Sequence, residues 1–118
     1  MSTATARAAP ISIDEYLDGE TRTDIKHEYL DGEVVAMGGA SARHGLIVTA
    51  LSLVIGPHAR SKGCQLFIAD MKLRVDHNDQ TYFYYPDLLL SCDPQDREPL
   101  FRRRPCRCRR RRRARCRS

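Results

Sequence analysis

The last 17 residues set the strongest limit on what this chain can fold into. Residues 102–118 read RRRPCRCRRRRRARCRS, with eleven Arg, three Cys, no acidic residue and no aliphatic side chain larger than Ala. A segment of this composition cannot bury an apolar core. The folding information must lie in residues 1–100, which hold nine Lys and Arg against fifteen Asp and Glu, a net charge of −6.

Three explanations of the segment 102–118 stay open. Blocks of like charge bind nucleic acid, so the segment could be a binding arm. Cys106, Cys108 and Cys116 could hold a metal, although three thiolates without a fourth ligand fit no structural zinc pattern. GC-rich coding DNA read in a shifted frame also yields Arg, Ala, Pro and Cys, because most Arg codons begin with CG. We favour the shifted frame and predict a disordered tail over 102–118.

Residues 1–10 are small and polar and predict a disordered leader, so that one domain covers residues 11–101. Ser12-Ile13-Asp14-Glu15 fits a capping box and predicts a short helix that ends near Gly19. The runs HEYL and EVVAM, joined by Asp31-Gly32, predict a β-hairpin over 27–37. Apolar residues at 46, 47, 50, 51, 54 and 55 predict an amphipathic helix over 41–60.

Two β-rich runs follow this helix. LFIADMKLRV (66–75) and TYFYYPDLLLSC (81–92) are separated by the turn-forming residues 76–79, and we expect adjacent strands of one sheet. The order of elements predicts an α/β arrangement with at least four strands and a helix on one face. Because a run as apolar as LLLSC needs cover on both faces, we expect the sheet to be incomplete.

The chain carries no sign of export or membrane insertion. It has no stretch of about 18 apolar residues and no apolar signal-peptide core, which indicates a cytoplasmic protein without a membrane partner. In that compartment cysteines are usually reduced, so Cys64 and Cys92 are predicted to be free thiols that act as small core residues.

One carboxylate stands out for chemistry. Tyr85-Pro86-Asp87 places an acid directly before the apolar strand Leu88-Leu89-Leu90. A solvated acid at the start of a strand is the alternative interpretation of that dipeptide.

Four blocks in order resemble those of the Uma-two family of restriction-endonuclease-like proteins, which carry a PD-(D/E)XK nuclease core. The blocks are HEYLDGEVVAM, GGASARHGLIVTALSLVI, FIADMKLRV and YYPDLLLS, within residues 11–99. The resemblance implies a restriction-endonuclease-like α/β core, with a central mixed β-sheet and flanking helices, that is incomplete at its C-terminus. It also implies Mg²⁺-dependent hydrolysis of DNA.

The resemblance points to three residues and gives a role to two of them. Asp87 matches the Asp of the motif and would hold Mg²⁺. Glu28 matches an acid that such nucleases add from an early element, with a solvated strand residue or a partner for Lys26 as alternatives. His44 opens the long helix, where it could bind phosphate, cap the helix or pack.

The chain departs from the family after Glu98. No Glu, Asp or Lys follows, so the family's second metal-holding acid and its lysine have no counterpart. We therefore expect a truncated, inactive copy of a DNA endonuclease. The alternatives are a non-catalytic nucleic-acid-binding protein that acts through its Arg-rich tail, and a dimerisation half that forms a homodimer.

Overall fold

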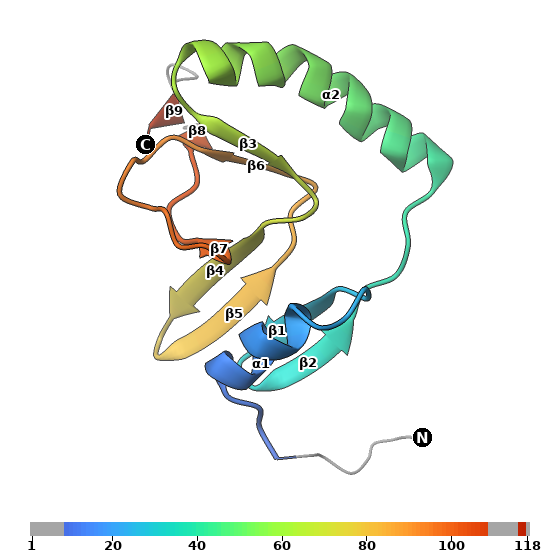
Figure 1. Cartoon of the computed structure of the whole chain (residues 1–118), viewed down its shortest axis with the longest axis vertical. Coiled ribbons are helices and arrows are strands. Elements are labelled where there is room, and N and C mark those ends of the chain that lie inside the picture. Colours follow the sequence, from blue (N-terminus) through green and yellow to red (C-terminus); the bar gives the residue numbers. More distant parts are fainter. Residues whose placement is uncertain (1–8, 109–115, 118) are drawn as a thin grey trace.

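The computed structural model describes residues 9–108 and 116–117. It is a mixed α/β protein with a central mixed sheet, which confirms the predicted fold class (Figure 1). In chain order the elements are α1 (Ile13–Glu20), β1 (His27–Leu30), β2 (Glu33–Ala36), α2 (Ala42–Ser61), β3 (Gln65–Ile68), β4 (Lys72–His77), β5 (Gln80–Tyr84), β6 (Leu88–Ser91), β7 (Phe101–Arg102), β8 (Arg107–Cys108) and β9 (Cys116–Arg117).

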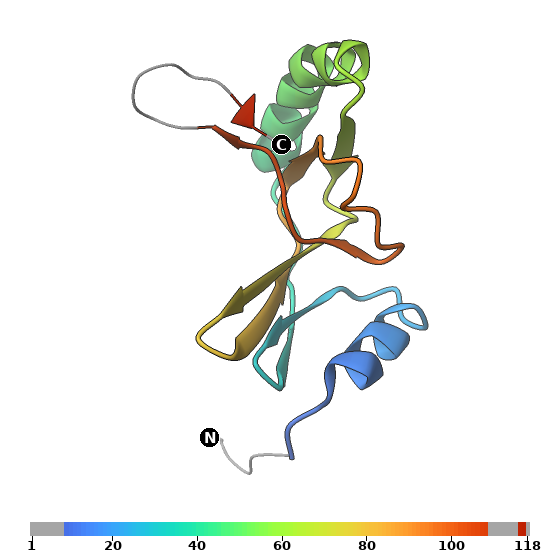
Figure 2. The same cartoon turned by 90° about the vertical axis from the view of Figure 1, so that its left-hand side faces the viewer.

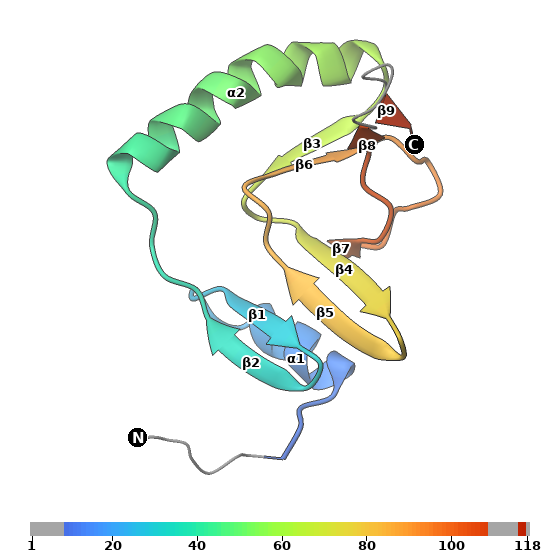
Figure 3. The same cartoon turned by 180° about the vertical axis from the view of Figure 1, so that it is seen from behind.

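The largest sheet has five strands in the order β2-β1-β5-β4-β7. Its pairs are antiparallel except β4 with β7, which is parallel and makes the sheet mixed. Strands β3 and β6 form a second, two-stranded antiparallel sheet. Figure 3 shows α2 lying over this second sheet, well away from the hairpin of β1 and β2.

Helix α1 is fixed by its cap and by an aromatic core. Ser12 accepts from the backbone N–H of Glu15, whose side chain accepts from the backbone of Ser12, so the predicted capping box is present. Tyr16 of α1 packs against Tyr29 and Phe83, with ring centroids 5.0 and 5.2 Å away. The Tyr16 hydroxyl donates a hydrogen bond to the carbonyl of His27, so the polar end of this buried side chain has a partner. Figure 2 shows α1 packed beside β1 and β2.

The predicted hairpin turn is confirmed. Asp31 and Gly32 adopt φ angles of 51° and 102°, the left-handed conformation that a tight two-residue turn requires. A Cβ on Gly32 would also lie only 3.0 Å from the Cβ of Pro10, so a side chain at this position would be both strained and crowded. Asn78 and Asp79 form the equivalent turn between β4 and β5, with φ angles of 51° and 63°.

The prediction that residues 66–75 and 81–92 form adjacent strands of a single sheet is only half right. The two runs pair, but both break midway, so that β4 and β5 join the large sheet while β3 and β6 form the small one. Pro86 has no N–H to continue the ladder, and Ala69, which faces Asp87 in the register of β3 and β6, adopts a φ of 59°. One backbone bond, from the N–H of Ala69 to the carbonyl of Asp87 (3.0 Å), spans the bend.

Helix α2 matches its predicted range to within one residue and is mostly exposed. It packs on β3 and β6 through its C-terminal part, where Ala59 is buried. Leu46, Leu53 and Val54 face outward with more than two thirds of their surface exposed. Neither helix in the described part of the chain is long and apolar enough to cross a membrane.

The predicted boundary at residue 101 falls inside a strand. Phe101 and Arg102 form β7 and are buried, because β7 pairs with β4. Buried Asp96 then accepts from the backbone N–H groups of Arg103 and Arg104, at 3.0 and 2.6 Å. The first residues of the predicted disordered tail therefore make defined contacts with the body of the chain. Residues 109–115 and 118 of the predicted tail, and 1–8 of the predicted leader, lie outside the described residues.

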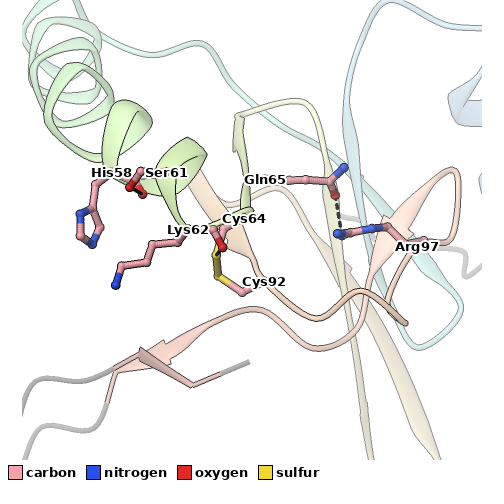
Figure 4. Close-up of a disulfide and its surroundings, with 7 residues drawn as sticks. All are labelled: His58, Ser61, Lys62, Cys64, Gln65, Cys92 and Arg97. Carbon is pink, nitrogen blue, oxygen red and sulfur yellow. Dashed lines mark hydrogen bonds between the residues drawn. A yellow bond between two sulfur atoms is a disulfide. The ribbon is translucent and has the colours of Figure 1, made fainter.

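The prediction for the two body cysteines is also wrong. Cys64 and Cys92 form a disulfide and are only partly buried (Figure 4). Gln65 pairs with Ser91, so Cys64 and Cys92 occupy the next cross-strand position at the end of the small sheet. The bond therefore joins the end of α2 to the end of β6.

Candidate functional site

Asp87 lies at the bend of the long hairpin. Its backbone carbonyl is held by Ala69, and Pro86 fixes the chain in front of it. Its side chain is 59% exposed, so the carboxylate is accessible from solvent. The residue that sequence analysis selected thus occupies the junction between the two sheets, where it is open to a ligand.

His44 comes to the same place from another element. The ring Nε2 of His44 lies 3.0 Å from the Oδ2 of Asp87, although 43 positions separate the two residues. Ser41 caps α2 by accepting from the backbone N–H of His44, so the His44 side chain is not the cap. The imidazole is 45% exposed and can act as a proton acceptor, a proton donor or a ligand beside the carboxylate. The structure brings these two predicted site residues together.

Glu28 is not brought into this pair. It lies on β1 opposite Val35, and no described contact joins it to Asp87 or His44. Within residues 9–108 and 116–117, no three His, Cys, Asp or Glu side chains form a group that could hold a metal ion. The alternative that Glu28 pairs with Lys26 is not observed, because the Nζ of Lys26 contacts the Oδ1 of Asp70 at 2.9 Å. A metal-binding role for Glu28 remains a prediction.

Sequence analysis missed a polar network on Glu20, beside the bend. The carboxylate of Glu20 is 5% exposed and accepts from Tyr85 (2.7 Å) and from the backbone and ring of His27 (3.0 and 2.8 Å). Burial acts to raise the pKa of Glu20, but the hydrogen bonds from His27 and Tyr85 outweigh it and hold the pKa below its usual value. Because Tyr85 is two residues before Asp87, this network holds the backbone that leads into the candidate site.

Lys72 is a second residue that sequence analysis did not select. It is 6% exposed on β4, its Nζ donates to the carbonyl of Leu100 at 3.4 Å, and it lies 5.4 Å from the ring centroid of Tyr85. Burial lowers the pKa of Lys72, while the negative charge of Glu20 opposes that shift. Neither Glu20 nor Lys72 belongs to a local motif, so only the tertiary contacts could have revealed them.

The donor chemistry at Asp87 fits Mg²⁺ in part. The ion prefers oxygen ligands, keeps several of its waters and commonly binds through one or two carboxylates together with substrate phosphates. Asp87 supplies one exposed carboxylate of that kind. Since no described third donor converges on Asp87 and His44, the remaining ligands would have to be water and substrate oxygens.

The mixed central sheet, the flanking helices and the Pro-Asp bend are consistent with an α/β protein of the restriction-endonuclease-like fold. Comparison with protein families agrees with this class. The Uma2 family, described as "Putative restriction endonuclease", matches residues 13–110. The chain belongs to this family, as the resemblance of its four blocks to the Uma-two family predicted.

Two curated relatives come from Synechocystis sp. The uncharacterized protein slr1290 is 40% identical over 88 residues, which cover 75% of this chain and 45% of the relative. The uncharacterized protein sll1609 is 29% identical over 87 residues, which cover 74% of this chain and 46% of the relative. The chain thus spans a little under half the length of these relatives. No solved structure matches it.

Proposed function

We propose that this chain carries part of the active site of a Mg²⁺-dependent DNA endonuclease, centred on Asp87 and His44. The contact between these two side chains carries the proposal, because it joins two residues that lie 43 positions apart and to both of which the family resemblance points. Membership of a family described as restriction endonucleases supports a nuclease activity at family level. DNA as substrate and a cytoplasmic location form part of the same proposal.

Asp87 would hold the metal, and His44 would orient the carboxylate and accept or donate a proton beside it. When bound, Mg²⁺ would activate water and stabilise the charge that develops on a scissile phosphate. Glu20 and Tyr85 would keep the bend in place. With one or two carboxylates and no described lysine at Asp87, we propose that the 118-residue chain alone does not cleave DNA appreciably.

Metal binding at Asp87 can be tested without any cleavage assay. We expect Mn²⁺ to broaden the NMR signals of residues next to Asp87 and His44, and Asp87→Asn to remove the effect while it preserves the side-chain shape. Asp79→Asn is the matched control, because Asp79 is exposed in a turn without a described ion pair. Equal broadening in the wild type and in Asp87→Asn would place the metal elsewhere and overturn the proposal.

A second candidate function rests on the Arg-rich tail. Eleven Arg without an acid in residues 101–118 favour binding to nucleic acid without catalysis. The shifted-frame explanation of the same segment predicts that a one-base correction near codons 101–106 opens a frame that encodes an apolar strand with Glu and, further on, Lys. Resequencing the gene and measuring the intact mass of the protein distinguish the binding arm from the shifted frame. If the frame is confirmed and no such coding sequence lies downstream, the binding arm is the explanation that stands.

A further inference from the structure

Two arginine side chains converge on one neutral oxygen at the start of β3. The Oε1 of Gln65 accepts from the Nη1 of Arg97 at 2.7 Å and from the Nη2 of Arg102 at 3.0 Å. Figure 4 shows Arg97 reaching the Gln65 side chain beside the end of the small sheet. Two guanidinium groups therefore share a single uncharged acceptor.

Arg102 is a buried cation. It is 5% exposed, and its guanidinium carbon lies 5.0 Å from the ring centroid of Phe67. Its Nη1 donates to the backbone carbonyls of Glu98 and Phe101, and its buried Nε has no partner among the described residues. All of its described acceptors are neutral, so the charge has no anionic partner.

The neighbouring arginines differ in this respect. Arg103 lies 3.7 Å from a carboxylate oxygen of Asp76, and Arg104 lies 3.4 Å from one of Asp93. In the part of the chain that the structure describes, neither Arg97 nor Arg102 has an acid within 4 Å. Among the four arginines of residues 97–104, the two that meet at Gln65 are therefore the ones without a described acidic partner.

A buried cation without a counter-ion is costly, whereas a guanidinium pair is well suited to the oxygens of a phosphate or sulfate group. The Oε1 of Gln65 occupies the position of one oxygen of such a group. If the flexible Gln65 side chain moves aside, an oxyanion can take its place between the two guanidinium groups and also reach the free N–H groups of Arg102.

We propose that Arg97 and Arg102, gated by Gln65, form a binding site for a phosphate-class oxyanion. Its occupant would be a backbone phosphate of nucleic acid, an assignment that rests on the proposed function. Gln65 pairs with Ser91, four residues along the chain from Asp87, which corresponds to about 13 Å along β6. At about 3.4 Å of axial rise per phosphate on one strand, the site would contact the backbone a few nucleotides from the scissile bond.

Thermal unfolding with inorganic phosphate as the probe tests the site itself. Sodium chloride at equal ionic strength is the reference. Phosphate also stabilises most proteins in general because it is excluded from their surface, so the test compares the phosphate-induced rise in midpoint between variants. At tenfold excess over Kd we expect the wild-type midpoint to rise by about 5 °C beyond that general effect. Gln65→Glu supplies the missing carboxylate, so it should unfold at a higher temperature without phosphate and lose the site-specific rise.

Arg97→Gln should also lose most of this rise, whereas Arg22→Gln should keep it, because Arg22 is an exposed residue paired with Asp18 on α1. Arg102 is left intact because its replacement could unfold the buried strand. Equal phosphate responses in the wild type, Gln65→Glu and Arg97→Gln would overturn the oxyanion site. This result does not depend on metal binding or cleavage, so it can fail or succeed independently of the proposed nuclease.

A short DNA duplex in EDTA separates the two possible sources of the oxyanion. We expect Arg97→Gln to weaken DNA binding and to lower the slope of log affinity against log salt by about one, relative to Arg22→Gln. If Arg97→Gln abolishes the phosphate response but leaves DNA binding equal to that of the control, the nucleic-acid assignment is overturned and a small phosphate-bearing ligand replaces it.

Discussion

Removal of the Cys64–Cys92 disulfide is expected to cost much of the stability of this domain. The bond closes a sequence separation of 28 residues. By the chain-entropy estimate, a loop of that length is worth about 3.5 kcal/mol at 25 °C, since the bond restricts the unfolded chain. Small domains are stable by only about 5–15 kcal/mol, so the double variant Cys64→Ser/Cys92→Ser should unfold at a much lower temperature, by about 15 °C or more.

The assay compares urea unfolding of three samples: the oxidised chain, the same chain in a phosphine reductant, and the double variant. We expect the last two to agree and to have a lower midpoint than the first. Cys106→Ser is the matched control, because the described contact of Cys106 with Leu90 uses its backbone N–H and survives the change. Because Cys106 is only partly buried, this change should cost no more than about 1 kcal/mol, well below the effect of the double variant.

Peptide mapping checks that the bond exists. Trypsin cleavage after Lys62, Lys72, Arg74 and Arg97 should release residues 63–72 and 75–97 as one disulfide-linked pair under non-reducing conditions. If that pair forms but reduction leaves the urea midpoint unchanged, the loop-closure reasoning is refuted. If the peptides are recovered separately from freshly prepared protein, the prediction of free thiols was right after all.

Three further predictions concern other parts of the molecule. Glu20 has a lowered pKa in the fold, so its contribution to stability should be present above about pH 4.3 and be lost as the pH falls through the folded pKa. Glu20→Gln should lower the free energy of unfolding by about 2 kcal/mol at pH 7 and weaken its fall with decreasing pH, measured by urea unfolding at several acidic pH values. An unchanged pH dependence would contradict this. Asp87→Ala should change the free energy of unfolding by less than about 0.5 kcal/mol, because its contact with His44 is exposed; a larger loss in calorimetry would mean a structural role. Deletion of residues 109–118, which contain seven Arg, should reduce the salt slope of DNA binding by up to about 6, whereas an unchanged slope would exclude the tail as the binding element.

Local signals in the sequence were sufficient for most of the elements. The capping box at Ser12, the Asp31-Gly32 turn and the apolar spacing of α2 each act within a few residues, so the corresponding helices and hairpin follow directly. The bend at Ala69 and Pro86 was not predicted, because two long β-rich runs on either side of a turn look like two straight strands. Only the donor lost at Pro86 and the left-handed conformation of Ala69, which faces the next residue Asp87, divide each run into two strands.

The site was predictable residue by residue but not as an arrangement. The family resemblance pointed to both Asp87 and His44 but not to their contact, which depends on how the linker between β2 and α2 places the helix. Glu20 was missed because its partners His27 and Tyr85 meet it only in the fold. The disulfide was missed because compartment statistics cannot say that two cysteines stand at facing positions of one ladder.

The bent hairpin has a consequence for how the chain folds. Strand pairing from the turn at Asn78 and Asp79 proceeds through His77↔Gln80 to Leu73↔Tyr84 and then to Ile68↔Leu88 and Gln65↔Ser91. Each step brings together residues whose neighbours are already paired, so no new long loop has to be closed. The β4–β5 and β3–β6 pairs can therefore form from a single nucleus, and we expect Asp87 to reach its position early in folding. A φ-value near zero for substitutions at this turn would show that folding begins elsewhere.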